Sequence, residues 1–159
     1  MIIKNKGMFL ETVLNTNIED YEKEGLLIRK MPVNSSIIEV NKNIITSKAK
    51  KNDLCDYIGL YKGIYIEFEA KETELDYFNL NNLKENQRSK LNTIFQLGGA
   101  SFLIVYFHKE NSFFGLPIQM LTKNLKKKIP YQWFIENGYL LEFDNLKLNI
   151  ITFINHLIS

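Results

Sequence analysis

The stretch Ile64-Tyr65-Ile66-Glu67-Phe68-Glu69-Ala70-Lys71 decides how this chain folds and what chemistry it can carry. Its β-branched and aromatic residues predict a strand, and successive side chains of a strand point to opposite faces. We expect the apolar residues to be buried on one face. Glu67, Glu69 and Lys71 then share the other face, where carboxylate and ammonium groups point at one place.

A second β-prone segment, Tyr57–Tyr61, comes directly before this strand, and Lys62-Gly63 between them predicts a tight hairpin turn. The pairing of the two strands can bring Asp56 beside Glu69. Two carboxylates, a backbone carbonyl and waters suit Mg²⁺, which serves phosphodiester hydrolysis as a Lewis acid and a source of hydroxide. A nearby lysine, here Lys71, can orient the attacking water or stabilise the developing charge.

The same residues have a second interpretation. Exposed strand faces often carry Glu and Lys side chains that only stay solvated, and an Asp before a Glu-X-Lys sequence also occurs by chance. From composition and spacing alone, a metal nuclease and a solvated strand face both remain open.

Composition sets broad limits. The 159 residues, 45% of them hydrophobic, suit one domain with its own core, and we treat residues 1–159 as a single domain. The net charge of +2 argues neither for nor against nucleic acid, but the excess of lysine over arginine favours contacts to the backbone rather than to bases. A lone cysteine, Cys55, and two histidines argue against a disulfide and a zinc site. With no signal-like or membrane-length apolar run, we expect a soluble cytoplasmic protein, associated with the nucleoid if it acts on DNA.

The rest of the chain predicts a mixed α/β sheet with helices packed on it. Helices are expected at Met8 to about Lys23, at Glu85–Leu97 and near Leu148–Ile158. Strands are expected at Leu26–Ile28, at Ala100–Phe107 and at Ser112–Leu116, the last two paired. Short helices are expected around Pro130.

The segment from Met31 to Cys55 differs from its surroundings because it has no aromatic residue. Ile37–Val40 and Ile44–Thr46 flank a polar turn and predict a hairpin. A cluster of lysines follows. We interpret this segment, at about 31–55, as an insertion that protrudes from the main body.

Several blocks, in order, resemble the RecU family of Holliday junction resolvases. They are Gly7–Glu11, Asp56–Gly63, Glu67–Thr73, Phe78-Asn79-Leu80, Asn82-Leu83 and Gln87. The resemblance runs from Gly7 to about Phe107 and is weaker after that. It implies the restriction-endonuclease-like PD-(D/E)xK fold and a homodimer that cuts four-way junctions symmetrically with Mg²⁺ or Mn²⁺ in recombination and repair.

Position by position, the resemblance implies roles for five residues. Asp56 and Glu69 are metal ligands, and Lys71 is the catalytic lysine. Gln87 matches a glutamine near the metal and is expected as a third metal ligand. Glu11 matches an acidic residue that reaches the same site and is expected to take part in catalysis. From the residues alone, Glu11 and Gln87 would equally fit solvated helix faces.

The protruding segment lies where RecU proteins carry a stalk that enters the junction centre. Candidate phosphate contacts are Lys42, Lys48, Lys50 and Lys51, together with Lys62 and Arg88 outside the segment. A solvated linker explains any single one of these lysines as well. The expected partners are four-way junction DNA and a second copy of the chain, with the recombinase and branch-migration machinery as further candidates.

Two departures from the family pattern matter. Leu54-Cys55 replaces the small hydroxyl residues that usually precede the catalytic Asp, and we expect Cys55 to be an inert packing residue. The stalk-like segment is short and lacks aromatic residues. Two alternatives to a resolvase therefore stay open: a nuclease of the same fold that cuts duplex or flap DNA, and a non-catalytic module that binds branched DNA or a recombinase.

Overall fold

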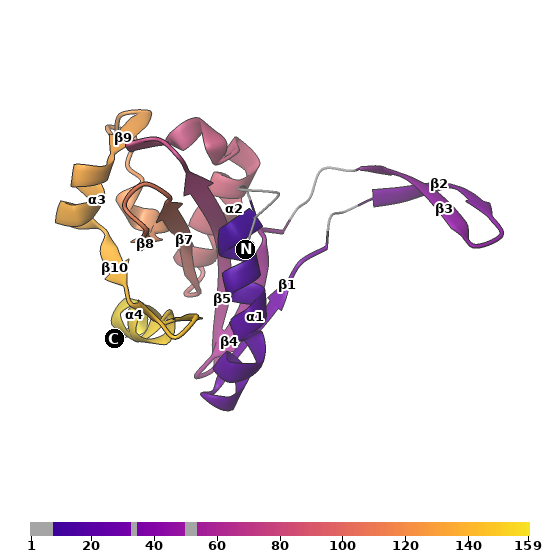
Figure 1. Cartoon of the computed structure of the whole chain (residues 1–159), viewed down its shortest axis with the longest axis horizontal. Helices are drawn as coiled ribbons and strands as arrows, with labels where there is room; N and C mark the ends of the chain where they lie inside the picture. The colour runs from indigo at the N-terminus through magenta and orange to yellow at the C-terminus, as the bar shows by residue number, and fades with distance from the viewer. Residues whose placement is uncertain (1–7, 33–34, 50–53) are drawn as a thin grey trace.

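The structure is a computed structural model that describes residues 8–32, 35–49 and 54–159 (Figure 1). Its helices are α1 (Phe9–Lys23), α2 (Glu85–Gln96), α3 (Tyr131–Asn137) and α4 (Ile151–Ile158). The longer strands are β1 (Leu26–Lys30), β2 (Ser35–Asn41), β3 (Ile44–Ala49), β4 (Tyr57–Tyr61), β5 (Ile64–Thr73), β7 (Ala100–Phe107) and β8 (Ser112–Pro117). The shorter ones are β6 (Tyr77–Asn79), β9 (Lys128–Pro130), β10 (Tyr139–Leu141), β11 (Phe143–Asp144) and β12 (Lys147–Leu148), and short 3₁₀ turns are η2 (Leu80–Asn82) and η3 (Ile118–Met120).

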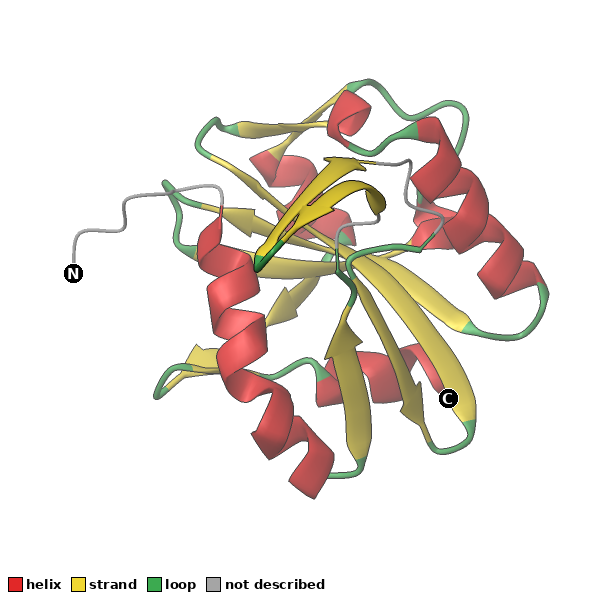
Figure 2. Ribbon diagram, turned by 90° about the vertical axis from the view of Figure 1, so that its right-hand side faces the viewer, coloured by secondary structure: helices red, strands yellow, loops and turns green. Residues whose placement is uncertain are grey.

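A six-stranded mixed sheet in the order β1-β4-β5-β7-β8-β10 forms the centre of the molecule. β5 and β7 are parallel, and the other neighbouring strands are antiparallel. Helices lie on both sides of the sheet (Figure 2). The expected mixed α/β sheet flanked by helices is therefore confirmed.

Each face of the sheet has its own hydrophobic core. On one face, α1 and α4 cover a layer of aromatic rings in which Phe68 stacks on Tyr57 and Phe102 at centroid distances of 4.9 and 4.8 Å. On the other face, α2 and α3 pack over residues such as Leu103 and Phe107. These two layers hold β5 in the interior of the protein.

Burial of β5 extends to both of its faces. The sequence predicted burial of the apolar face and left a solvated polar face as an open alternative. Glu67 and Glu69 are instead 0% and 1% exposed, because α2 and the segment around Cys55 cover the polar face. Carboxylates in such a place need hydrogen bonds or a cation.

The hairpin β2–β3 projects from the body and forms a separate two-stranded sheet (Figure 1). We call it the stalk-like hairpin. The predicted pairing is present, with Asn41 opposite Ile44 across the turn. Its apolar side chains are 62–70% exposed: Ile37, Ile38, Val40, Ile44 and Ile45.

The C-terminal part contains more strand than expected. The segment around Pro130 forms β9, which pairs with β6, before α3 begins at Tyr131. The last helix begins at Ile151, because Lys147 and Leu148 pair with β11. Strands of two or three residues are too short to show a periodicity of two. In the part of the chain that the structure describes, no helix has the length and apolar character needed to cross a membrane.

Candidate active site

Asp56 and Glu69 lie side by side at one end of the sheet. Tyr57 pairs with Phe68, so Asp56, one residue earlier, stands opposite Glu69. The Asp56 backbone N–H donates to Glu69 Oε1 at 3.0 Å, and the Ala70 backbone N–H donates to Asp56 Oδ2 at 3.1 Å. The hairpin thus fixes two carboxylates next to each other, as the sequence predicted.

The two oxygens of the buried Glu69 carboxylate differ in their hydrogen bonds. Its Oε2 is buried and accepts no hydrogen bond from the described residues. Burial, and then the adjacent Asp56, raises the pKa of Glu69 to about 8. A divalent cation would relieve the repulsion between the two carboxylates, so the donor set fits a metal of the Mg²⁺ type.

Lys71 lies on the same face of β5 as Glu69. Its Nζ is 3.4 Å from Glu69 Oε2, and the lysine side chain is 21% exposed. An ammonium group placed this close to a carboxylate, yet reachable from solvent, can contact a substrate oxygen beside the carboxylates. The structure therefore brings Asp56, Glu69 and Lys71 together.

Lys30 is a member of this cluster that sequence reasoning missed. It is the last residue of β1, and its Nζ lies 3.4 Å from Asp56 Oδ1 and 3.5 Å from Glu11 Oε1. Glu11, in the first turn of α1, is thereby placed next to the site, in agreement with the resemblance. Because the sequence predicted a strand only to Ile28, its pattern did not indicate that Lys30 reaches the carboxylates.

The described residues contain no group of three or more His, Cys, Asp or Glu side chains arranged to hold a metal ion. A cation at this site would be held by Asp56 and Glu69, with waters or backbone oxygens completing its coordination. The predicted third ligand, Gln87, is engaged elsewhere. Its Oε1 accepts the Lys84 backbone N–H at 3.0 Å and so caps the start of α2.

Cys55 and Glu67 are buried next to the carboxylate pair and are joined by a hydrogen bond. The Cys55 backbone N–H donates to Glu67 Oε1 at 3.2 Å. This bond is the neighbour of the one from the Asp56 backbone N–H to Glu69. The Cys55 side chain is buried, and burial together with Glu69 strongly raises the pKa of its thiol. A thiol held in its neutral form is unreactive, in agreement with the packing role expected for Cys55.

The predicted DNA-binding residues lie in different parts of the molecule. Lys42 occupies the turn of the stalk-like hairpin and Lys48 is exposed on β3, whereas Lys50 and Lys51 lie outside the described residues. Lys62 lies at the β4–β5 turn, a whole strand away from Asp56, where its Nζ donates to Asn155 Oδ1 at 3.3 Å. Arg88 donates to the backbone oxygens of Leu121 and Thr122, so its guanidinium joins α2 to the segment after η3.

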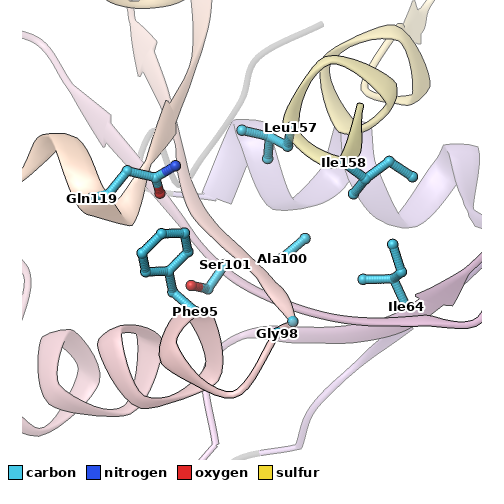
Figure 3. Close-up of a pocket in the computed structure, with 9 residues that line it drawn as sticks. Ile64, Phe95, Gly98, Ala100, Ser101, Gln119, Leu157 and Ile158 are labelled. Atoms are coloured by element: carbon cyan, nitrogen blue, oxygen red, sulfur yellow. The ribbon is translucent and has the colours of Figure 1, made fainter.

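A pocket of about 240 Å³ lies at the opposite end of the sheet, between the end of α2, the start of β7 and α4 (Figure 3). Phe95, Leu157 and Ile158 contribute apolar walls, and no ionisable side chain lines it. It has none of the groups that hydrolysis needs, so the carboxylate cluster is the better candidate for an active site.

Comparisons with known proteins identify the family of the chain. The family model described as "Recombination protein U" (RecU) matches residues 5–156. The chain belongs to the RecU family. A RecU from Ureaplasma parvum, named a Holliday junction resolvase, is 33% identical over 87% of this chain and 85% of its own length. Another from Pediococcus pentosaceus, with the same name, is 34% identical over 89% of this chain and 78% of its own length.

A solved structure supports the fold of this RecU family member. Hjc from Archaeoglobus fulgidus, a Holliday junction resolvase, matches with a TM-score of 0.55 at 16% sequence identity. The match covers 86% of this chain and 92% of Hjc. At this identity the likeness concerns the fold alone, and it places the sheet and its helices in a known architecture.

Proposed function

We propose that this chain is a metal-dependent endonuclease that resolves Holliday junctions. One observation carries the proposal: Asp56 and Glu69 are fixed side by side with the Lys71 ammonium 3.4 Å from Glu69. The same residues lie in a chain of the RecU family, whose named relatives are Holliday junction resolvases. A solvated strand face does not explain why Glu69 is buried beside the partly exposed Asp56, with both carboxylates held by backbone N–H donors.

The residues divide the chemistry between them. Asp56 and Glu69 would hold Mg²⁺ or Mn²⁺, which supplies a Lewis acid and lowers the pKa of bound water. Lys71 orients the attacking water and stabilises negative charge on the phosphate as the water oxygen bonds to phosphorus and the bond to the leaving sugar oxygen breaks. Lys30 offsets part of the negative charge of Glu11 and Asp56.

Symmetric cutting of a four-way junction needs two such sites. A homodimer with twofold symmetry supplies them, and it matches the symmetry of the substrate. In this proposal the stalk-like hairpin enters the junction centre, and Lys42 and Lys48 contact phosphates there. The protein then acts at the nucleoid in recombination and repair.

Cleavage of a mobile four-way junction tests the proposal. The junction, a matched duplex and a matched flap are incubated with the protein in Mg²⁺, in Mn²⁺ and in EDTA. We expect paired nicks at symmetric positions in the junction, dependent on the divalent metal, and little cutting of the other two substrates.

The other outcomes separate the alternatives. Faster cutting of the duplex or flap would make the protein a nuclease with a different substrate. Tight binding of the junction without metal-dependent nicking would make it a non-catalytic module. Sedimentation of the protein with and without junction DNA tests the homodimer, and a monomer bound to the junction would contradict it.

A further inference from the structure

Four lysines gather in the segment that runs from the end of η3 to the first residue of β9. Residues 122–128, which we call the lysine loop, contain Lys123, Lys126, Lys127 and Lys128, and all four are exposed. In the described part of the chain, none of them forms an ion pair with an acidic side chain. Their charge is therefore available to a ligand outside the chain.

The lysine loop is tied to the body at both ends. Arg88 donates to the backbone oxygens of Leu121 and Thr122 at its start. Near its end, the Leu80 backbone N–H donates to the Lys127 oxygen at 2.7 Å. The buried pair Phe78 and Ile129 then anchors β9 on β6. Charges on a frame fixed in this way lose little freedom when they bind a ligand.

The strand β6, on which β9 is anchored, follows directly after β5, the strand that carries Glu69 and Lys71. Thr73, two residues after Lys71, donates through Oγ1 to the Tyr77 backbone oxygen at 3.0 Å. Tyr77 begins β6, and the Lys128 ammonium lies 5.2 Å from the centre of its ring. In Figure 1, β9 lies at the top of the molecule, where β5 ends, and the stalk-like hairpin leaves on the other side. The lysine loop thus lies beyond the catalytic cluster, away from the stalk-like hairpin.

The charge and position together indicate the ligand. We propose that the lysine loop binds the phosphate backbone of a DNA arm as it runs from the scissile phosphate away from the junction centre. The inference rests on the proposed function and adds a second binding region to it. Lysines act as point charges that suit phosphates, and they carry little base information, so the contact is independent of sequence.

Replacement of Lys126 and Lys127 by Gln, both in one protein, tests the inference. The control is Lys23→Gln with Lys147→Gln, an exposed and a partly exposed lysine at the opposite end of the molecule, which pair with Asp20 and Glu24. Both variants lose the same charge. Affinity for a long-armed junction is measured in EDTA over a range of salt concentrations, and thermal unfolding checks that both variants fold.

We expect the loop variant to bind more weakly and its slope of log affinity against log salt to fall by about 0.9 per lysine. The control should keep the wild-type slope. When the arms are shortened stepwise, the difference between loop variant and wild type should disappear. Wild-type affinity and slope in the loop variant would overturn the inference and leave the loop to another partner, such as an acidic protein segment.

Failure of the proposed function would look different. If the wild-type protein binds junctions but does not nick them in Mg²⁺ or Mn²⁺, the proposed function fails. The salt dependence of the two variants still decides whether the lysine loop contacts DNA.

Discussion

The two hairpins β2–β3 and β4–β5 are alike in local design and opposite in their surroundings. Each has a two-residue turn with a lysine at positive φ, 53° at Lys42 and 50° at Lys62, between two antiparallel strands. Yet Phe68 in the second hairpin is 0% exposed, whereas Ile45 in the first is 62% exposed.

The difference lies in what covers each hairpin. β5 has β4 and β7 on its edges and helices on both faces, whereas the stalk-like hairpin forms a sheet of its own. Local sequence therefore specifies a hairpin, and neighbouring elements decide whether it becomes a core or a projection. Only the covered hairpin can hold two carboxylates in contact, because fixed backbone donors on both strands keep them in place.

The largest expected difference between the two hairpins is in the cleavage rate after a carboxylate is replaced. Asp56→Asn or Glu69→Gln should reduce single-turnover cleavage of a junction by about 10⁴-fold, about 5.4 kcal/mol, because a metal ligand is lost. Junction binding should survive or tighten, because a carboxylate that repels phosphate has been neutralised. Glu39→Gln on the stalk-like hairpin is the control and should keep the wild-type rate. Normal cutting by either site variant would refute the assignment.

Stability should differ almost as much between the hairpins. Phe68→Ala removes a ring packed between Tyr57 and Phe102, and we expect the free energy of unfolding to fall by about 3–5 kcal/mol. Ile45→Ala should change it by less than about 0.5 kcal/mol because the side chain is exposed. Urea unfolding followed by circular dichroism measures both. A loss of similar size in Ile45→Ala would show that the stalk-like hairpin is packed in solution, as a dimer contact would require.

Two lysines should separate rate from affinity. Lys71→Ala should lower the cleavage rate by about 100-fold with little change in junction affinity, because its ammonium acts beside the carboxylates. Lys42→Ala should leave the rate at saturating protein unchanged and weaken binding, with a salt slope lower by about 0.9. A Lys71 variant that cuts at the wild-type rate would remove Lys71 from the mechanism.

The smallest expected effect is stabilisation by metal. Mg²⁺ or Mn²⁺ at about ten times its dissociation constant should stabilise the folded protein by about 1.4 kcal/mol, because the cation binds the folded state alone. Differential scanning calorimetry should show a higher Tm that EDTA reverses. Glu69→Gln should lose most of the shift, and Glu39→Gln should retain it. An equal shift in both variants would place the metal elsewhere.

Most of the sheet could be predicted from the sequence because its long strands have clear signals. The alternation in β5 and the continuous apolar run of β7 each identify a strand without help from distant residues. The burial of Glu67 could not be predicted, since it results from α2 and Cys55 lying over that face. The short strands β6 and β9 depend on a partner about 50 residues away.

The site shows the same division. Asp56 and Glu69 were predictable because one hairpin pairs them, and the turn at Lys62-Gly63 fixes their register. Lys30 was not, because its contacts with Asp56 and Glu11 join three elements of the fold. The side chain of Gln87 caps its own helix, a local alternative that the family pattern does not reveal.

The chain leaves the body and returns to it at almost the same point. Lys30 pairs with Tyr57, and the Met31 backbone N–H donates to the Asp56 backbone oxygen at 2.8 Å. The pairing of β1 with β4 is therefore complete whatever chain connects Met31 to Asp56. The entropic cost of a longer connection grows only with the logarithm of its length. The stalk-like hairpin is therefore an exchangeable module: evolution or an engineer can lengthen, shorten or replace it to alter reach into a substrate without rebuilding the catalytic centre at its base.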